Sequence, residues 1–232
     1  MQLTIKNTIF FSLIVQIITG IISLHGLFIR LPKKHQILSD VLILETIVQF
    51  IEMIFYIWIS YAIININNIT SRRYIDWFIT TPAMLLSTIM FMKYQELKEQ
   101  QKLKDQLSTY QFIKDNKVLI SKIFLFNLLM LLFGYLGEKT IISKIISTTI
   151  GFVFFYKSFH LIYNNYAKKS ILGLQLFYFL FIVWSLYGVA ALLSVKFKNI
   201  MYNLLDIVAK NFYGLYIYYK ILQISNNTSS YL

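Results

Sequence analysis

The chain has 232 residues, of which 57% are hydrophobic and only 14% are charged, whereas soluble domains contain about 25% charged residues. Its apolar residues gather in blocks as long as a membrane-spanning helix, so the soluble class is excluded. The net charge of +12 falls mainly in the connections between these blocks rather than on one folded face, which argues against nucleic-acid binding. With no cysteine, the chain can form neither a disulfide nor a thiolate metal site.

Seven apolar segments follow one another, and each is long enough to cross a hydrocarbon core of about 30 Å at about 1.5 Å per residue. Short alternating segments of about ten residues, which a transmembrane β-barrel requires, do not recur. We therefore predict an all-α, seven-transmembrane-helix bundle that forms one domain over residues 1–232. The predicted segments cover roughly residues 3–28, 41–64, 72–92, 117–136, 140–164, 171–195 and 199–223.

The connections between the segments differ in charge. Basic residues concentrate in Arg30–Asp40, Lys93–Lys117 and Lys168-Lys169, and the positive-inside rule makes these three connections cytoplasmic. We expect an integral, multi-pass protein with its N-terminus outside and its C-terminus cytoplasmic, in the plasma membrane or an internal membrane of a host cell. The Lys93–Lys117 insert either extends the third helix or forms a solvated surface helix.

The third segment carries a polar stripe. Arg73, Asp76, Thr80 and Ser87 lie at offsets of 0, 3, 7 and 14 residues, so they share one face of a helix. This stripe is either a structural salt bridge with helix-capping hydroxyls or a counterion complex for a cation on another helix.

The last segment supplies such a cation. Lys210 lies in the middle of this segment, with Asp206 four residues earlier on the same face. Each charge costs about 2.5–3.5 kcal/mol in a membrane-spanning helix, so intramembrane charges of both signs indicate a functional site. The two segments together favour the counterion complex.

The residues that carry these charges resemble the motifs of microbial rhodopsins. The third segment matches Arg-Tyr-x-Asp-Trp-x-x-Thr-Thr-Pro over residues 73–82, and the last matches Asp-x-x-x-Lys-x-x-x-Gly over residues 206–214. The sixth segment contains the Trp-x-x-Tyr pattern at residues 184–187. The resemblance implies a retinal protein whose fold extends over the whole chain.

The resemblance also implies roles for single residues. Lys210 would form the Schiff base to all-trans retinal, Asp76 would be the primary counterion and proton acceptor, and Asp206 the second counterion, with Arg73 beside them. Two carboxylates stabilise a protonated Schiff base, and flat aromatic faces confine a planar polyene. The remaining cofactor-binding residues that it implies are Trp77, Thr80, Thr81, Met84, Trp184 and Tyr187.

Two departures from the pattern of the pumps in this family affect the expected mechanism. Gly188 and Ala191 replace larger residues, so we expect a looser pocket near the retinal ring. Ser87 stands eleven residues after Asp76, where proton pumps usually carry a carboxylate, and serine cannot hold a proton for reprotonation.

The second segment adds two acids on one face, Glu45 in the cytoplasmic half and Glu52 near midspan. They are either protonated, hydrogen-bonded acids or part of an acid-lined cation pathway. We expect both to lie off the face that meets Lys210, so that replacing them changes conduction and leaves the visible absorption nearly intact. The predicted pathway consists of Ser12, Glu45, Glu52, Arg73, Asn203 and Asn211.

The chain resembles the group 1 viral rhodopsins, which act as light-gated cation channels. The points of resemblance are Ser12, Glu45, Glu52, Asn203 and Asn211, together with Asp76, Thr80 and Ser87. We therefore predict a light-gated cation channel and no enzymatic activity. An outward proton pump is the first alternative and would need Glu45 as its proton donor. A photosensor is the second, with a signalling partner docked on Lys93–Lys117.

The expected partners are the lipid bilayer, permeating monovalent cations or protons, inhibitory calcium, and further copies of the chain in a homo-oligomer. His25 and His160 have no second ligand at metal-binding spacing, so no metal site is predicted.

Overall fold

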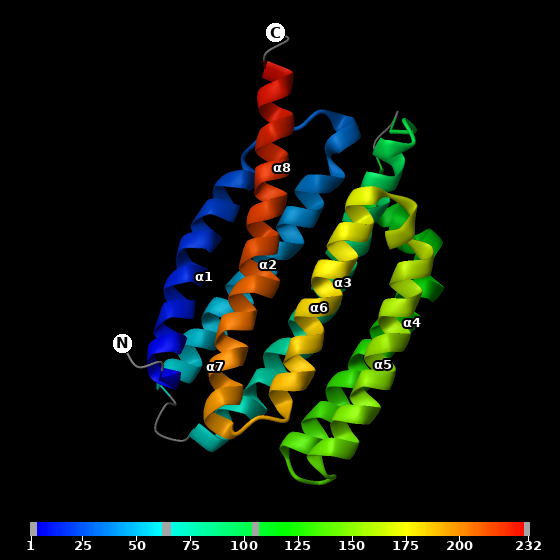
Figure 1. Cartoon of the computed structure of the whole chain (residues 1–232). Coiled ribbons are helices and arrows are strands. Elements are labelled where there is room, and N and C mark those ends of the chain that lie inside the picture. Colours follow the sequence, from blue (N-terminus) through cyan, green and yellow to red (C-terminus); the bar gives the residue numbers. More distant parts are fainter. Residues whose placement is uncertain (1–3, 62–65, 104–106, 230–232) are drawn as a thin grey trace.

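The structure, a computed structural model, describes residues 4–61, 66–103 and 107–229, and these residues form helices without strands (Figure 1). The predicted all-α, seven-helix bundle is confirmed. Six of its rods are α1 (Ile5–Leu27), α2 (Ile37–Tyr61), α3 (Ile66–Glu99), α4 (Thr109–Glu138), α5 (Lys144–Asn165) and α6 (Ile171–Ala191). Short 3₁₀ turns at Lys33–His35 and Ala167–Lys169 lie in two of the connections.

The seventh rod is divided into three pieces. It comprises α7 (Val195–Asp206), a π-helical turn at Ile207–Asn211 and α8 (Phe212–Ser229). Because the π turn interrupts it, only six of the described helices are long and apolar enough on their own to cross a membrane. A π turn widens a helix locally and is often found at functional sites, and this one contains Lys210.

Several predicted boundaries are wrong by a few residues. Residues 140–143 precede α5, because the Ser143 hydroxyl caps that helix by accepting from the Ile146 amide at 3.3 Å. Residues 192–194 connect α6 to α7 rather than continuing α6. The third helix extends to Glu99, as one of the two readings of the insert predicts, and runs without a break through Pro82. The predicted ends at residues 3 and 62–64, and residues 104–106 of the insert, lie outside the described residues.

The α1 helix shows how the chain divides polar and apolar side chains. Its exposed face is apolar, with Phe11, Ile14, Ile18 and Ile21 each more than half exposed. Its buried face is polar or small and consists largely of Thr8, Ser12, Gln16, Thr19, Gly20 and Ser23. An apolar exterior around a polar interior suits a helix that faces lipid outside and helices inside.

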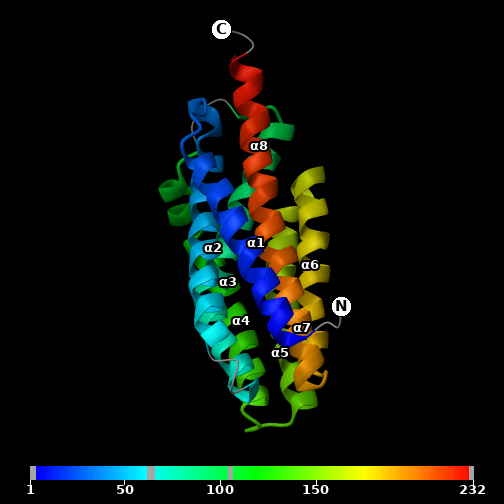
Figure 2. The same cartoon turned by 90° about the vertical axis from the view of Figure 1, so that its left-hand side faces the viewer.

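The seventh rod lies between α1 and α6, with α2 and α3 behind it in Figure 1. In Figure 1, α1 begins at one end of the bundle and α8 ends at the other, while α4 and α5 lie on the side of the bundle opposite α1. Turned by 90°, Figure 2 shows α1 lying against α7 and α8, with α2 to one side and α6 to the other. This arrangement places the π turn in the interior of the bundle.

The helices α4 and α5 approach each other closely where two small residues meet. A Cβ atom at Gly137 would lie 1.9 Å from the Ser147 Oγ and 2.6 Å from its Cβ. Small residues at membrane helix interfaces permit such contact between backbones. The α4–α5 pair thus has its own packing site, next to the cavity described below.

Candidate functional site

Lys210 is the centre of a buried charge cluster. Its Nζ donates a hydrogen bond to Asp76 Oδ2 at 2.9 Å, and it lies 3.0 Å from Glu52 Oε1 and 3.7 Å from Asp206 Oδ1. All four side chains are at most 3% exposed. The cluster therefore joins α2, α3 and the seventh rod around one amine.

The position of Glu52 corrects one prediction. We expected Glu45 and Glu52 to lie off the face that meets Lys210, and for Glu52 this is wrong, because its Oε1 lies 3.0 Å from the amine nitrogen. The spacing of seven residues places the two acids on one face of α2. It does not determine how that face is turned in the bundle.

Asp206 is held by three donors. Arg73 Nη1 donates to Asp206 Oδ2 at 2.9 Å, the Tyr56 hydroxyl donates to the same oxygen at 2.7 Å, and the Tyr187 hydroxyl donates to Oδ1 at 2.8 Å. Charge-assisted hydrogen bonds of this kind stabilise an ionised carboxylate. The sequence identified Arg73 and Tyr187, but it gave Tyr187 only a role in lining the pocket and missed Tyr56.

The charges of this cluster do not balance. Three carboxyl groups, those of Glu52, Asp76 and Asp206, face two cations, Arg73 and Lys210, so full ionisation would leave one buried negative charge. A buried uncompensated charge is strongly destabilising, so the cluster is neutral only when one carboxyl group holds a proton. Glu52 accepts no hydrogen bond from a tyrosine or an arginine, whereas Asp206 accepts three.

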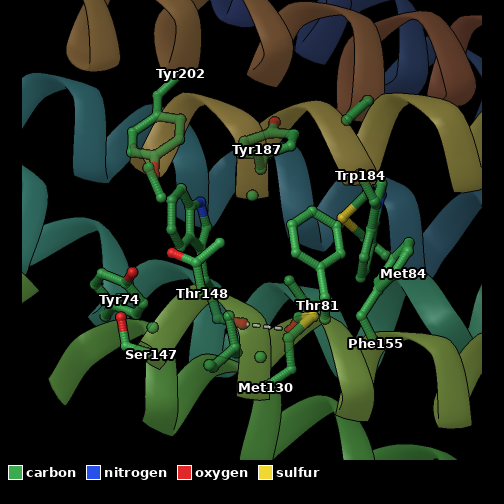
Figure 3. A pocket seen from close by; sticks show the side chains of 18 of the residues that line it. Tyr74, Thr81, Met84, Met130, Ser147, Thr148, Phe155, Trp184, Tyr187 and Tyr202 are labelled. Atoms are coloured by element: carbon green, nitrogen blue, oxygen red, sulfur yellow. Dashed lines mark hydrogen bonds between the residues drawn. The ribbon is translucent and has the colours of Figure 1, made fainter. Parts of the chain in front are cut away.

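A cavity extends from Lys210 between α3, α6 and the seventh rod on one side and α4 and α5 on the other. The space inside it that protein atoms do not fill is about 790 Å³, including the part open to the outside. Figure 3 shows Trp184, Met84 and Phe155 at one end and Tyr74 and Tyr202 at the other. An apolar cavity of this kind with an amine at its edge fits an apolar polyene that carries one reactive carbon.

Most of the predicted cofactor-binding residues reach this cavity. Its lining includes Trp77, Thr81, Met84, Trp184 and Tyr187 together with Lys210. Thr80 is not among the lining residues; it is fully buried, and its hydroxyl donates to the Asp76 carbonyl at 2.9 Å. The lining residues that the sequence did not single out include Tyr74, Met130, Ser147, Thr148, Gly151, Phe152, Phe155 and Tyr202.

The predicted loosening of the pocket is only partly realised. Gly188 and Ala191 both line the cavity, but a Cβ at Gly188 would lie 2.5 Å from Cζ of Phe152. The Phe152 ring from α5 therefore fills the space that the missing side chain leaves. A pattern on α6 alone could not reveal this compensation.

The predicted pathway residues form two groups on either side of Lys210. In the first, Asn203 accepts from Arg73 Nη2 through its side chain and from the Ser12 hydroxyl, at 2.8 Å, through its carbonyl. In the second, Ser87 donates to Glu45 Oε1, and Asn211 Nδ2 donates to Gln16 Oε1 at 3.1 Å. The two groups lie toward opposite ends of the bundle.

Additional polar residues complete these groups. The Asn203 side chain donates to Thr8 at 2.7 Å, Asn211 donates to Thr19 at 2.6 Å, and the Ser23 hydroxyl donates to Gln49 Oε1 at 3.2 Å. Buried amides on otherwise apolar segments are a signal that would have found Gln16 and Gln49. Tyr56 had no such signal, because interfacial tyrosines are common in this sequence.

The histidines lie outside the charge cluster. His25 Nδ1 is 3.0 Å from the Tyr218 hydroxyl, and His160 Nε2 is 2.9 Å from the Asn164 side chain. Among the described residues, no group of three or more His, Asp or Glu side chains is placed to hold a metal ion.

Comparisons with known proteins bear on the family and the fold of the chain. A family model described as bacteriorhodopsin-like protein matches residues 7–224. The chain is similar to the crystal structure of the viral rhodopsin OLPVRII, with 27% identity, a TM-score of 0.79, and coverage of 95% of this chain and 98% of that chain.

More distant structures share the fold. Exiguobacterium sibiricum rhodopsin is 18% identical, with a TM-score of 0.75 and coverage of 95% of this chain and 96% of that chain. Xanthorhodopsin, described as a light-driven ion pump with dual chromophore, is 16% identical, with a TM-score of 0.73 and coverage of 97% and 94%. No curated protein matches the chain significantly.

Proposed function

Because the chain belongs to the bacteriorhodopsin-like family, whose members bind retinal through a Schiff base to a lysine, we propose that it is a light-gated channel for small monovalent cations. We further propose that all-trans retinal binds at Lys210 and that the channel resembles those of the group 1 viral rhodopsins. When bound, retinal supplies a light-driven change of shape next to a positively charged nitrogen.

The chain's own residues would hold this group and its proton. Trp77 and Trp184 would confine the polyene, while Thr81, Met84 and Tyr187 would complete the walls of the cavity. These side chains are mostly rigid and apolar, so they would exclude water from the reactive nitrogen and leave its charge to the carboxyl groups.

The three carboxyl groups would divide the proton chemistry among them. Asp76 makes the shortest contact to the Lys210 nitrogen and is the proposed proton acceptor. Asp206 is the proposed permanent anion, because three donors already stabilise its charge. Glu52 accepts no hydrogen bond from a tyrosine or an arginine and is the proposed carboxyl group that holds a proton in the dark.

The observation that carries the channel proposal is the contact of Glu52 with Lys210 at 3.0 Å. Glu52 lies between the two pathway groups and also touches the nitrogen whose charge would change after illumination. A carboxyl group attracts a passing cation. A change in charge at Lys210 would therefore act directly on the pathway, without a long-range conformational relay.

The experiment that tests the proposal is the photocurrent measured against holding voltage in cells that express the chain. A channel current reverses its sign at the ionic equilibrium potential and moves with the ion gradient. A pump current keeps its direction at every voltage, and that result would overturn the channel proposal. Carboxylates also bind calcium, so external calcium is expected to reduce the current.

An outward proton pump is a second candidate, favoured by one observation. The Glu45 side chain reaches the Ser87 hydroxyl, so a carboxyl group from α2 stands beside the position where pumps carry their donor on α3. For a pump, illuminated cells should acidify the medium without any voltage reversal. Glu45→Gln should then slow the return to the dark state, whereas in a channel it should mainly reduce conductance.

A further inference from the structure

Three amide side chains form a buried group that no function described so far uses in full. Gln16 of α1, Gln49 of α2 and Asn211 of the π turn are each at most 1% exposed, and we call them the amide cluster. Each has one polar atom without a hydrogen-bond partner in the structure, Nε2 of each glutamine and Oδ1 of the asparagine. Two neighbours share this feature, Glu45 through Oε2 and Tyr213 through its hydroxyl.

The amide cluster follows one seam of the bundle. Asn211 bonds to Gln16 and to Thr19 one turn further along α1, and Ser23 bonds to Gln49 after another turn. The seam therefore runs for about two helical turns between α1, α2 and the seventh rod. It lies on the side of Lys210 nearer the C-terminal end of α8.

Gly214 explains how Gln49 enters this seam. A Cβ at residue 214 would lie 2.1 Å from Gln49 Nε2 and 3.9 Å from the Glu45 Cβ. The missing side chain thus gives the Gln49 amide its place against the α8 backbone. From the sequence alone, Gly214 is recognised only as the last residue of the Asp-x-x-x-Lys-x-x-x-Gly motif.

Unpaired polar atoms of both kinds point to water in the seam. A buried donor or acceptor left unpaired costs about 1–3 kcal/mol, and five in one region is more than native structures normally tolerate. Turning an amide over would only exchange which of its two ends is free. Since free donors and free acceptors occur together, water molecules can satisfy both, as buried waters usually do.

We infer that the amide cluster is a hydrated constriction in the ion pathway and that Gln49 is its selectivity-determining residue. The inference rests on the proposed channel function. A small monovalent cation that enters the seam exchanges part of its hydration shell for amide and hydroxyl oxygens and keeps the remaining waters. Gln49 takes part in this exchange through both ends of its amide. Its oxygen is held by the Ser23 hydroxyl, and its nitrogen lies in the space that Gly214 leaves open.

The hydration is tested by infrared difference spectroscopy of the retinal-loaded protein in water and in oxygen-18 water. Gln49→Leu should abolish wild-type water bands, and the matched variant Gln175→Leu, on an exposed face of α6, should retain them. Identical water bands in Gln49→Leu and wild type would overturn the inference. This measurement needs only a light-active protein, so it decides the matter for a channel or a pump.

The selectivity is tested by the reversal potential with sodium on one side and potassium on the other. Gln49→Leu should shift that potential and reduce the current about tenfold, a factor that corresponds to about 1.4 kcal/mol in the barrier. A current with unchanged size and reversal potential would contradict the role of Gln49. If the wild-type current never reverses, the channel proposal fails, and the infrared bands alone decide whether the amide cluster is hydrated.

A second variant guards against a failure of Gln49→Leu to fold. Gly214→Ala should displace the Gln49 amide without removing any polar group, and it should reproduce both the altered water bands and the shifted reversal potential. The matched control is Gly20→Ala, because a Cβ at this buried glycine of α1 would meet no atom within 4 Å. Equal behaviour of Gly214→Ala and Gly20→Ala would overturn the inference.

Discussion

Lys210 has a different setting from every other lysine that the structure describes, since three carboxyl groups lie within 4 Å of its nitrogen. Lys210→Ala should therefore abolish visible absorption after retinal is added. The matched control is Lys157→Ala, because Lys157 is exposed on α5 and its nitrogen lies over two aromatic rings. A band in Lys210→Ala that hydroxylamine bleaches would show that retinal is linked elsewhere.

Asp76 makes the closest contact to that nitrogen, so its charge should have the largest effect on the visible band. Asp76→Asn should shift the absorption to longer wavelength or make the chromophore lose its proton more readily at alkaline pH. Absorption spectra over a pH series check this, with the exposed Asp115→Asn as control. Unchanged spectra would transfer the counterion role to Asp206 or Glu52.

At the level of single residues, much of the charge cluster around Lys210 could be predicted from the sequence. Arg73, Asp76, Asp206 and Lys210 were found because intramembrane charges are rare and their spacing places them on defined helical faces. Tyr56 could not be found, because nothing local marks a tyrosine that donates to a carboxylate on another helix.

Among the helices, the α4–α5 contact at Gly137 and Ser147 gives a prediction about stability. Gly137→Ala should destabilise the fold by about 1–3 kcal/mol, because the added methyl group overlaps Ser147. Thermal denaturation in detergent measures this, with Gly20→Ala as the control. Adding Ser147→Gly should restore part of the loss, and equal melting temperatures for Gly137→Ala and Gly20→Ala would contradict the packing argument.

The connection between α1 and α2 gives a prediction about pH. His35 Nδ1 lies 2.7 Å from the Tyr94 hydroxyl of α3, and burial together with Lys34 and Lys98 lowers the pKa of His35. A lowered pKa means that the folded state favours the neutral ring. The resulting stability is complete above the unfolded value of about 6.5 and is lost as the pH falls through the folded value.

The measurement is the melting temperature in detergent between neutral and mildly acidic pH. It should fall on acidification, and His35→Gln should reduce this fall. The effect should be small, because His35 is only partly buried and salt screens its neighbours. An identical pH profile in wild type and His35→Gln would contradict the proposed contribution.

Helix existence could be predicted from hydrophobic length, but helix ends could not. The fifth helix begins at Lys144, later than the apolar residues predict, because the Ser143 hydroxyl caps its N-terminus. The π turn at Ile207–Asn211 left no trace in the apolar pattern, since hydrophobicity does not record which backbone amides are bonded.

At the level of the whole bundle, the rotation of each helix about its axis determines which side chains contact each other. The spacing of Glu45 and Glu52 predicted a shared face, but only packing turns that face so that Glu52 meets Lys210 and Glu45 meets Ser87. The fold followed from seven apolar blocks and a family resemblance. The contact between the proposed retinal site and the proposed pathway could be found only in the assembled helices.

In the proposed channel, light gates the ion pathway because Glu52 belongs both to the retinal site and to the pathway. The most direct test is the action spectrum of the photocurrent at neutral and alkaline pH. As the pH rises, Glu52 should ionise 3.0 Å from the Lys210 nitrogen and shift the wild-type maximum to shorter wavelength. Glu52→Gln should lose this shift and about nine-tenths of the current, a factor of ten that equals about 1.4 kcal/mol, while Glu45→Gln should keep the shift. A Glu52→Gln variant that keeps both the shift and the wild-type current would contradict the account.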